Sequence, residues 1–195
     1  MKPSLVLGSG SPRRKELLER MGFRLLVMKP DIVEQPQPDE TPAEYIARNC
    51  REKAAAVLNS PDCPLTAPVL TADTIVTCDG KLLEKPLDQN HARQMLHSLS
   101  GRSHQVMTAV AIARGALRQQ FQVTTEVVFR QLSEREVDWY VATGEPMDKA
   151  GGYGIQGRAA GMVTALQGSY TNVVGLPLSE VLQCLAEHFD VHPPV

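Results

Sequence analysis

Strand-like and helix-like segments alternate along the chain, and this alternation constrains the fold more than any other feature of the sequence. Such an order is typical of α/β domains, in which helices cover a sheet. No long linker, low-complexity tract or internal repeat interrupts it, and the proline-rich stretch QPQPDETP is the only break. The 195 residues, 43% of them hydrophobic, are enough to bury one sizeable core. We therefore expect one α/β domain over residues 1–195, without a separable linker.

The charge balance argues against two classes of partner. Twenty basic and 22 acidic residues give a net charge of −2, and aromatic residues make up only 5% of the chain. Nucleic acids and anionic membranes favour basic surfaces, and single strands also favour aromatic side chains. No apolar run approaches the roughly 20 residues of a membrane span, and no secretory signal is recognisable. We expect a cytoplasmic protein with no nucleic-acid or membrane partner.

The four cysteines and five histidines do not form a metal-binding pattern. The cysteines lack the close pairs of zinc ribbons and redox motifs, and the histidines lack HExxH or similar spacing. Free thiols and structural or surface histidines are the expected outcome.

The stretch GSGSPRRKELLE places positive charge where a helix disfavours it. Ser11 followed by Pro12 is typical of an N-cap and the first helical position, so a helix is expected to begin here. Free N–H groups make this end partially positive, which disfavours Arg13, Arg14 and Lys15. A bound anion would compensate for this charge, and we expect one at the helix start.

A second helix is predicted from TPAE at residues 41–44 to about residue 58. The tetrapeptide combines an N-cap threonine, a proline at the first helical position and a capping-box glutamate. Lys53 shares a face of this helix with Cys50 and Val57. Two interpretations are open: the lysine stem covers apolar surface while its ammonium reaches water, or the ammonium points into an anion site.

The stretch LTADTIVTCDGKLLEKP predicts a β-hairpin. The dipeptide DG at residues 79–80 favours a type I′ turn, which would pair Ile75 with Glu84. Asp73 would then lie on the same face as Glu84, as its diagonal neighbour. Two carboxylates would converge there, with Lys85 beside them.

An aspartate inside an apolar strand is costly and needs a compensating partner such as a metal ion or a lysine. Alternatively, Asp73 accepts local hydrogen bonds and Glu84 lies at an exposed edge. The pair together with Lys85 favours a functional explanation. Carboxylate oxygens suit Mg²⁺ or Mn²⁺, ions that commonly accompany a phosphate substrate.

The glycine-rich stretch DKAGGYGIQGRAAG permits positive φ angles and close approach of the backbone to a ligand. It is neither a Walker A loop nor a dinucleotide fingerprint. Taken alone, it is better explained by a tight turn with a bulge. Before it, the pattern predicts a helix over residues 91–99, strands over 105–113 and 122–129, and a capping box at 133–136 that starts another helix.

Seven ordered sequence blocks resemble the Maf nucleotide pyrophosphatases: SGSPRR, REKA, LTADTIV, EKP, SGRSHQVMTAVA, DKAGGYGIQG and NVVGLPL. They cover nearly the whole chain. The resemblance implies an elongated, two-lobed Maf/ITPase-like α/β fold, with a mixed twisted sheet flanked by helices and an active-site cleft between the lobes. It also implies hydrolysis of nucleoside triphosphates to the monophosphate and pyrophosphate, dependence on Mg²⁺ or Mn²⁺, and assembly as a homodimer.

The resemblance further implies roles for individual residues. Those expected to bind the substrate phosphates are Ser9, Ser11, Arg13 and Arg14. Those expected around the reaction are Asp73 as the proton acceptor, with Lys53, Lys85, Glu84 and Glu34. A divalent ion on Glu84, Asp73 and Glu34 would polarise the phosphates, while a water activated by Asp73 attacks the α-phosphorus.

Three positions resemble the family branch that acts on dTTP and UTP: Arg13, Thr74 and Gln156. In the sister branch that acts on 7-methyl-GTP, tryptophan, glutamine and glutamate tend to occupy the corresponding places. Two alternatives remain beside the pyrimidine branch. The chain could belong to the 7-methyl-GTP branch, or it could be a nucleotide-binding regulator of cell division and septum formation with little turnover.

Overall fold

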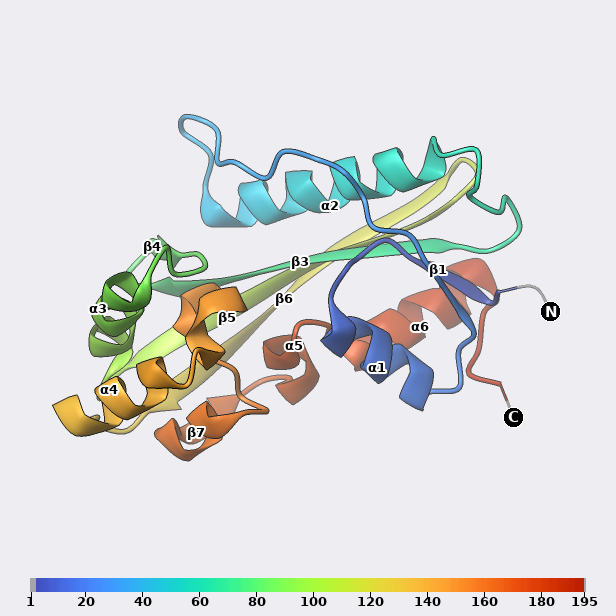
Figure 1. The fold of residues 1–195 in the computed structure, drawn as a ribbon. Helices are drawn as coiled ribbons and strands as arrows, with labels where there is room; N and C mark the ends of the chain where they lie inside the picture. The colour runs from blue at the N-terminus through green and yellow to red at the C-terminus, as the bar shows by residue number, and fades with distance from the viewer. Residues whose placement is uncertain (1–2, 195) are drawn as a thin grey trace. The chain divides into compact units, whose positions relative to one another are not determined.

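The computed structural model describes residues 3–194, which form two compact units (Figure 1). The first unit contains the chain up to Asp73, Thr108–Val123 and the chain from Gly175 onward. The second contains Thr74–Met107 and Thr124–Val174. Three strands of the sheet carry the chain from one unit into the other, because each unit boundary before Gly175 falls inside a strand.

The strands form one mixed sheet. Its members are β1 (Leu5–Leu7), β2 (Leu25–Val27), β3 (Val69–Cys78), β4 (Lys81–Leu83), β5 (Ser103–Arg114), β6 (Leu117–Phe129) and β7 (Val163–Gln167). The strand order is β2-β1-β3-β5-β6-β7, with β4 paired to β3. β1 is parallel to β2 and β3, whereas β3 with β4 and β6 with β7 are antiparallel. The predicted α/β class with a mixed sheet is confirmed.

The helices are separated by strands or by short turns. They are α1 (Pro12–Arg20), α2 (Pro42–Leu58), α3 (Gln89–Leu99), α4 (Glu134–Ala142), α5 (Tyr170–Val174) and α6 (Leu178–Phe189), with 3₁₀ turns η1 (Glu145–Asp148), η2 (Ala150–Gly152) and η3 (Arg158–Met162). The predicted capping boxes start α2 and α4, so backbone donors at both helix starts have side-chain acceptors. Within residues 3–194, no helix is long and apolar enough to cross a membrane.

The start of α1 differs from the expectation in one respect. Ser11 occupies the N-cap position and Pro12 the first helical position, as predicted, but the Ser11 side chain makes no capping hydrogen bond. The Ser11 N–H instead donates to Ser9 Oγ at 3.2 Å. The start of this helix therefore has one fewer internal acceptor than a capped helix.

The β3–β4 hairpin forms with the predicted turn. Asp79 and Gly80 both have positive φ, 50° and 74°, as a type I′ turn requires. The expected pairing of Ile75 with Glu84 is wrong, because the ladder ends one pair earlier, at Leu83. The Glu84 carbonyl instead accepts a hydrogen bond from Gly151 N at 3.1 Å, which ties this end of the hairpin to the glycine-rich segment.

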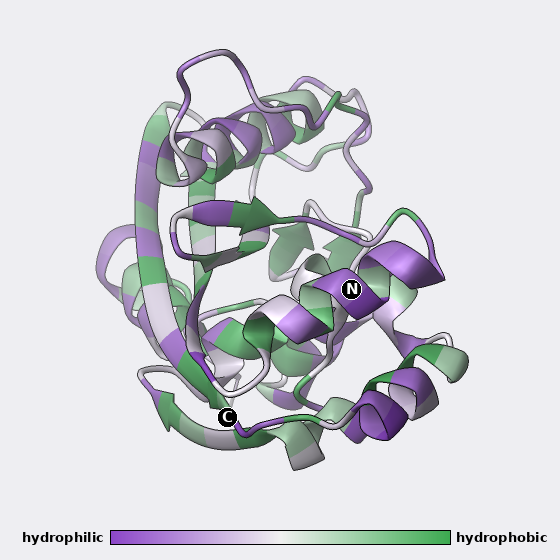
Figure 2. Ribbon diagram, turned by 90° about the vertical axis from the view of Figure 1, so that its left-hand side faces the viewer, coloured by the Kyte–Doolittle hydropathy of each residue, from purple (hydrophilic) through white to green (hydrophobic). Residues whose placement is uncertain are grey.

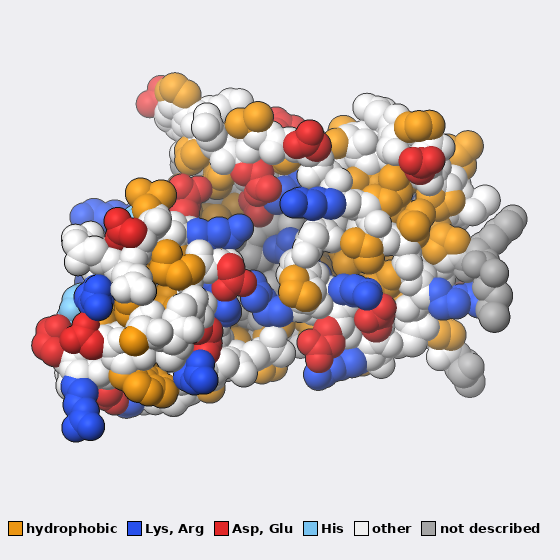
Figure 3. Space-filling view, viewed as in Figure 1, with side chains coloured by type: hydrophobic (Ala, Val, Ile, Leu, Met, Phe, Trp, Pro, Cys, Tyr) orange, Lys and Arg blue, Asp and Glu red, His pale blue; other side chains and the backbone are white. Residues whose placement is uncertain are grey.

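The first unit buries β1 completely. All three of its residues are 0% exposed, as expected for a strand between two parallel neighbours. Val6 packs in an apolar cluster with Val57 of α2 and Val69 of β3. The long strand at the left of Figure 2 carries green, white and purple bands in turn. In burial, β6 shows the alternation of a half-buried strand, whereas β3 and most of β5 are buried. On the face in Figure 3, acidic and basic side chains are interspersed, consistent with a net charge near zero.

The core of the second unit contains a buried histidine. His104 is 3% exposed, lies edge-on to Phe129 with ring centroids 5.0 Å apart, and forms a 2.7 Å hydrogen bond between Nε2 and the Tyr153 hydroxyl. Its Nδ1 is buried without a hydrogen-bond partner among the described residues. Burial lowers the pKa of His104 to about 4, because a charged ring would lose its hydration here.

We predict that His104 makes the protein acid-sensitive between pH 6.5 and 4. In the unfolded state His104 binds a proton below about pH 6.5, whereas in the folded state it does so only below about pH 4. The stabilisation present above pH 6.5 is therefore lost as the pH falls. The difference between these two pKa values corresponds to about 3 kcal/mol. Measured by urea unfolding, the free energy of unfolding should fall less across this pH range in His104→Gln than in wild type. The exposed-site variant His97→Gln should behave as wild type. Equal losses in His104→Gln and wild type would contradict the assignment.

Candidate active site

Lys53 lies at the centre of a polar cluster in the first unit, formed with Glu34, Asn49 and Asp73. It is 7% exposed on the buried face of α2, together with Ile46, Cys50 and Val57. Its ammonium donates to Asp73 Oδ1 at 2.9 Å and to Glu34 Oε2 at 2.7 Å. The interpretation in which this ammonium reaches water is therefore wrong, because carboxylates take the place of solvent.

Asp73 interrupts an otherwise buried strand. Along β3 every residue is buried except Asp73 and Thr74, which are half-buried. One Asp73 oxygen accepts from Lys53, and the other accepts from Asn49 Nδ2 at 2.8 Å. Two charge-assisted hydrogen bonds offset the desolvation of a carboxylate whose side chain is 14% exposed.

The backbone of α2 is fixed against β3 beside this cluster. The Thr71 hydroxyl donates to the Cys50 carbonyl at 2.8 Å, and Cys50 Sγ donates to the Ala109 carbonyl at 3.0 Å. Burial raises the pKa of Cys50 to about 12, so this thiol stays protonated and acts as a donor. These contacts hold the helix in the position from which Lys53 reaches the strand.

Asn49 is a site residue that the sequence analysis missed. It is 0% exposed and lies one turn before Lys53 on the same helix face. Its Oδ1 is buried without a hydrogen-bond partner among residues 3–194. The available signal was a second polar residue on an apolar helix face, four positions from the lysine.

Arg14 lies close to the same cluster. It is 9% exposed, and its guanidinium donates to Ser9 Oγ at 3.0 Å and to the Gly175 carbonyl at 2.8 Å. Burial lowers the pKa of Arg14 from its ordinary value, while attraction to Asp73 opposes this shift and repulsion from Arg13 adds to it. A buried guanidinium next to a second arginine at a helix start favours the anion that the sequence predicts.

Close packing brings the loop before α1 to β3. Gly8 N donates to the Leu70 carbonyl at 2.8 Å, and a Cβ on Gly8 would lie 2.6 Å from Thr71 Cγ2. Glycine is therefore required at this position by the approach of the neighbouring strand. The loop that carries Ser9 and Ser11 begins directly after this contact.

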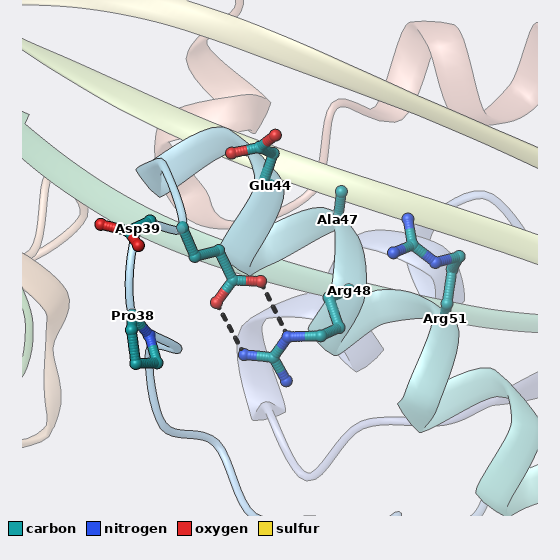
Figure 4. A pocket seen from close by; sticks show the side chains of 7 residues that line it. Pro38, Asp39, Glu44, Ala47, Arg48 and Arg51 are labelled. Carbon is teal, nitrogen blue, oxygen red and sulfur yellow. Dashed lines mark hydrogen bonds and ion pairs between the residues drawn. The ribbon is translucent and has the colours of Figure 1, made fainter.

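Arg48 holds the proline-rich stretch, which directly follows Glu34, against α2 (Figure 4). Its guanidinium pairs bidentately with Glu40, at 2.8 and 2.9 Å, and also donates to the Gln35 carbonyl at 2.8 Å. The hydrogen bonds from Arg48 lower the pKa of Glu40 to about 2. Because Gln35 directly follows Glu34, this arrangement limits how far Glu34 can move from Lys53.

Four of the predicted site residues belong to the second unit. Thr74 is half-buried in β3, and Glu84, Lys85 and Gln156 are exposed. The backbone of Glu84 contacts the glycine-rich segment through Gly151. Within this unit, the hairpin end is thus tied by its backbone to the segment that carries Gln156.

The predicted metal ligands are oxygen donors from both units. Glu34 and Asp73 offer carboxylates to the same ammonium in the first unit, a donor type that fits Mg²⁺ or Mn²⁺. Glu84, the third predicted ligand, belongs to the second unit. In the part of the chain that the structure describes, no group of three or more His, Cys, Asp or Glu is placed to hold a metal ion. The ligand set stays a prediction.

Comparison with known proteins identifies the family. Residues 4–188 match the model of the Maf-like protein family, so the chain belongs to this family. It is 50% identical over 187 residues to a dTTP/UTP pyrophosphatase of Photorhabdus laumondii, covering 95% of this chain and 94% of that protein. It is also 50% identical to proteins of that name from Salmonella typhimurium, over 96% of this chain and 93% of the relative, and from Escherichia coli O157:H7, over 94% and 92%.

We predict that Asn49→Asp destabilises the protein by about 2–4 kcal/mol at pH 7, the order expected when buried like charges face one another. The substitution preserves side-chain size but replaces the Nδ2 donor, 2.8 Å from Asp73, with an oxygen. Chemical denaturation measures the loss, and Asn90→Asp, on an exposed position of α3, serves as the matched control. Unchanged stability of Asn49→Asp would show that Asn49 does not donate to Asp73.

Proposed function

We propose that this chain is a nucleoside triphosphate pyrophosphatase that hydrolyses dTTP and UTP to the monophosphate and pyrophosphate. The observation that carries the proposal is the cluster around Asp73, a carboxylate hydrogen-bonded by Lys53 and electrostatically coupled to buried Arg14. This combination of a base and cations suits attack of water on a phosphoanhydride. The relatives that share half of the sequence over nearly the whole chain carry the same activity in their names.

The chemistry needs one proton acceptor and several anion-binding groups. A water oxygen would bond to the α-phosphorus, its proton would pass to Asp73, and the bond to the bridging oxygen would break to release pyrophosphate. Arg13 and Arg14, at the start of α1, would bind the phosphates with Ser9 and Ser11. These groups lower the barrier to the extent that they bind the charge developing in the transition state more strongly than they bind the substrate.

Charge on the leaving pyrophosphate would be balanced by Lys53, Lys85 and the arginines. A divalent cation, Mg²⁺ or Mn²⁺, held by Asp73, Glu34 and Glu84, would polarise the phosphates when bound. Lys53 is hydrogen-bonded to two of these three carboxylates. The lysine would therefore hold their positions when the cation is absent and compete with it for their oxygens.

Pyrimidine preference would rest on Arg13, Thr74 and Gln156. A glutamine amide both donates and accepts, so Gln156 can pair with the edge of a uracil or thymine base. Gln156 is exposed in the glycine-rich segment, where a ligand can reach it. A cytoplasmic location and a homodimer, both expected at the outset, remain predictions.

The proposal is tested by measuring pyrophosphate release with Mg²⁺ or Mn²⁺ across dTTP, UTP, CTP, GTP, ATP and 7-methyl-GTP. We expect dTTP and UTP to be the preferred substrates and Asp73→Asn to lower kcat by roughly 10³-fold or more while remaining folded by circular dichroism. Turnover of a folded Asp73→Asn variant at the wild-type rate would remove Asp73 from the base role. Preference for 7-methyl-GTP would place the chain in the sister branch, and absence of turnover would favour the nucleotide-binding regulator.

We further predict that Gln156→Glu lowers kcat/KM for dTTP and UTP by about 10²-fold. A carboxylate has no N–H donor, so a carbonyl oxygen of the base would be left without a hydrogen bond. Background hydrolysis of GTP should change by less than about threefold, since discrimination of this kind arises only where the amide pairs with the base. Steady-state kinetics on UTP, dTTP, CTP and GTP measure this difference. An equal loss on every nucleotide would argue against base recognition by Gln156.

A further inference from the structure

The glycine-rich segment is held by a carboxylate that the proposed chemistry does not use. Glu145, the first residue of η1, has a side chain that is only 15% exposed. Its Oε1 lies 3.1 Å and its Oε2 3.2 Å from the backbone nitrogen of Arg158, which donates to this carboxylate. The Lys149 ammonium also donates to the Glu145 carbonyl at 2.9 Å, which closes η1 on itself.

Tyr140 connects this carboxylate to the other end of the same segment. The residue is 0% exposed in α4, and its hydroxyl donates to Glu145 Oε1 at 3.0 Å. The hydroxyl oxygen in turn accepts from Gly154 N at 3.2 Å. Burial raises the pKa of Tyr140, so the hydroxyl keeps the proton that it donates. One buried hydroxyl thus contacts both the carboxylate and the start of the segment.

The two anchors lie symmetrically about Gln156. Gly154 N and Arg158 N are each two residues away from it, and a backbone hydrogen bond from Gly157 N to the Gly154 carbonyl, at 3.0 Å, closes the turn between them. Gln156 itself is exposed. Its backbone is therefore fixed from inside the unit, while its side chain is left available to a ligand.

The Glu145 carboxylate lies very close to the backbone of Gly157. A Cβ at this position would lie 1.9 Å from Glu145 Oε1 and 2.5 Å from its Cδ. The φ of Gly157 is −100°, which any residue can adopt, so an alanine here would displace the Glu145 carboxylate without straining the backbone through φ. Gly161, a few residues on, has nothing within 4 Å of a Cβ and provides a matched control.

We propose that Tyr140 and Glu145 are positioning residues that set base selectivity by holding the turn around Gln156. The inference rests on the proposed function, in which Gln156 contacts the pyrimidine base. Neither residue needs to touch substrate: Tyr140 is fully buried, and Glu145 is engaged by the segment itself. Loosening either anchor lets the turn sample other conformations, and the amide then meets the base in the correct orientation less often.

The most direct variant is Tyr140→Phe, which removes the hydroxyl and keeps the ring that packs in the core. We expect KM for UTP and dTTP to rise about tenfold with kcat changed less than about threefold, because ground-state recognition of the base is weakened. Gly157→Ala should act in the same direction, since the new Cβ displaces the carboxylate. Gly161→Ala should behave as wild type. Thermal unfolding of each variant confirms that the protein assayed is folded.

The double variant Tyr140→Phe/Gln156→Ala separates positioning from general loosening. If Tyr140 acts through Gln156, its effect on the ratio of kcat/KM for UTP over GTP disappears once Gln156 is alanine. Persistence of the full Tyr140→Phe effect in that background, or unchanged selectivity of both Tyr140→Phe and Gly157→Ala, would overturn the inference while the proposed function stands. A wild-type protein without preference for UTP and dTTP would instead overturn the proposed function itself, and the inference with it.

Discussion

The ion pairs of Lys53 are the interaction on which the rest of the first unit depends. The buried ammonium of Lys53 is stabilised by hydrogen bonds to the carboxylates of Glu34 and Asp73. The Asp73 carboxylate, in the middle of β3, is in turn stabilised by hydrogen bonds from Lys53 and Asn49. Lys53 and Asp73 thus each offset the cost of desolvating the other's charge. The arrangement also leaves a potential proton acceptor close to a buried guanidinium, which is the combination that phosphate chemistry requires.

Much of the surrounding structure holds this cluster in place. Thr71 and Cys50 fix α2 against the sheet, and Arg48 fixes the proline-rich stretch that directly follows Glu34. In the second unit, Tyr140 and Glu145 do the same for the turn around Gln156. The residues expected to contact substrate are thus anchored by hydrogen bonds within their own unit, which favours local geometry that is set before substrate arrives.

Local signals predicted the elements well, because capping boxes, an Asp-Gly turn and apolar periodicity act over a few residues. They predicted the helix from Pro42 to Leu58 and the I′ turn at Asp79. The pairing of Ile75 with Glu84 failed because Glu84 contacts Gly151, a residue distant in sequence. Asn49 shares an apolar helix face with Lys53, which was a local signal, but its partner Asp73 lies 24 positions away, so no local pattern specified their contact.

The central claim is that water attacks the α-phosphorus, and one isotope experiment tests it directly. Hydrolysis of dTTP by the wild-type protein in H₂¹⁸O, followed by mass spectrometry of both products, shows which phosphorus received the water oxygen. The account predicts one ¹⁸O atom in the thymidine monophosphate and none in the pyrophosphate. Label in the pyrophosphate, or release of thymidine diphosphate with labelled phosphate, would contradict it.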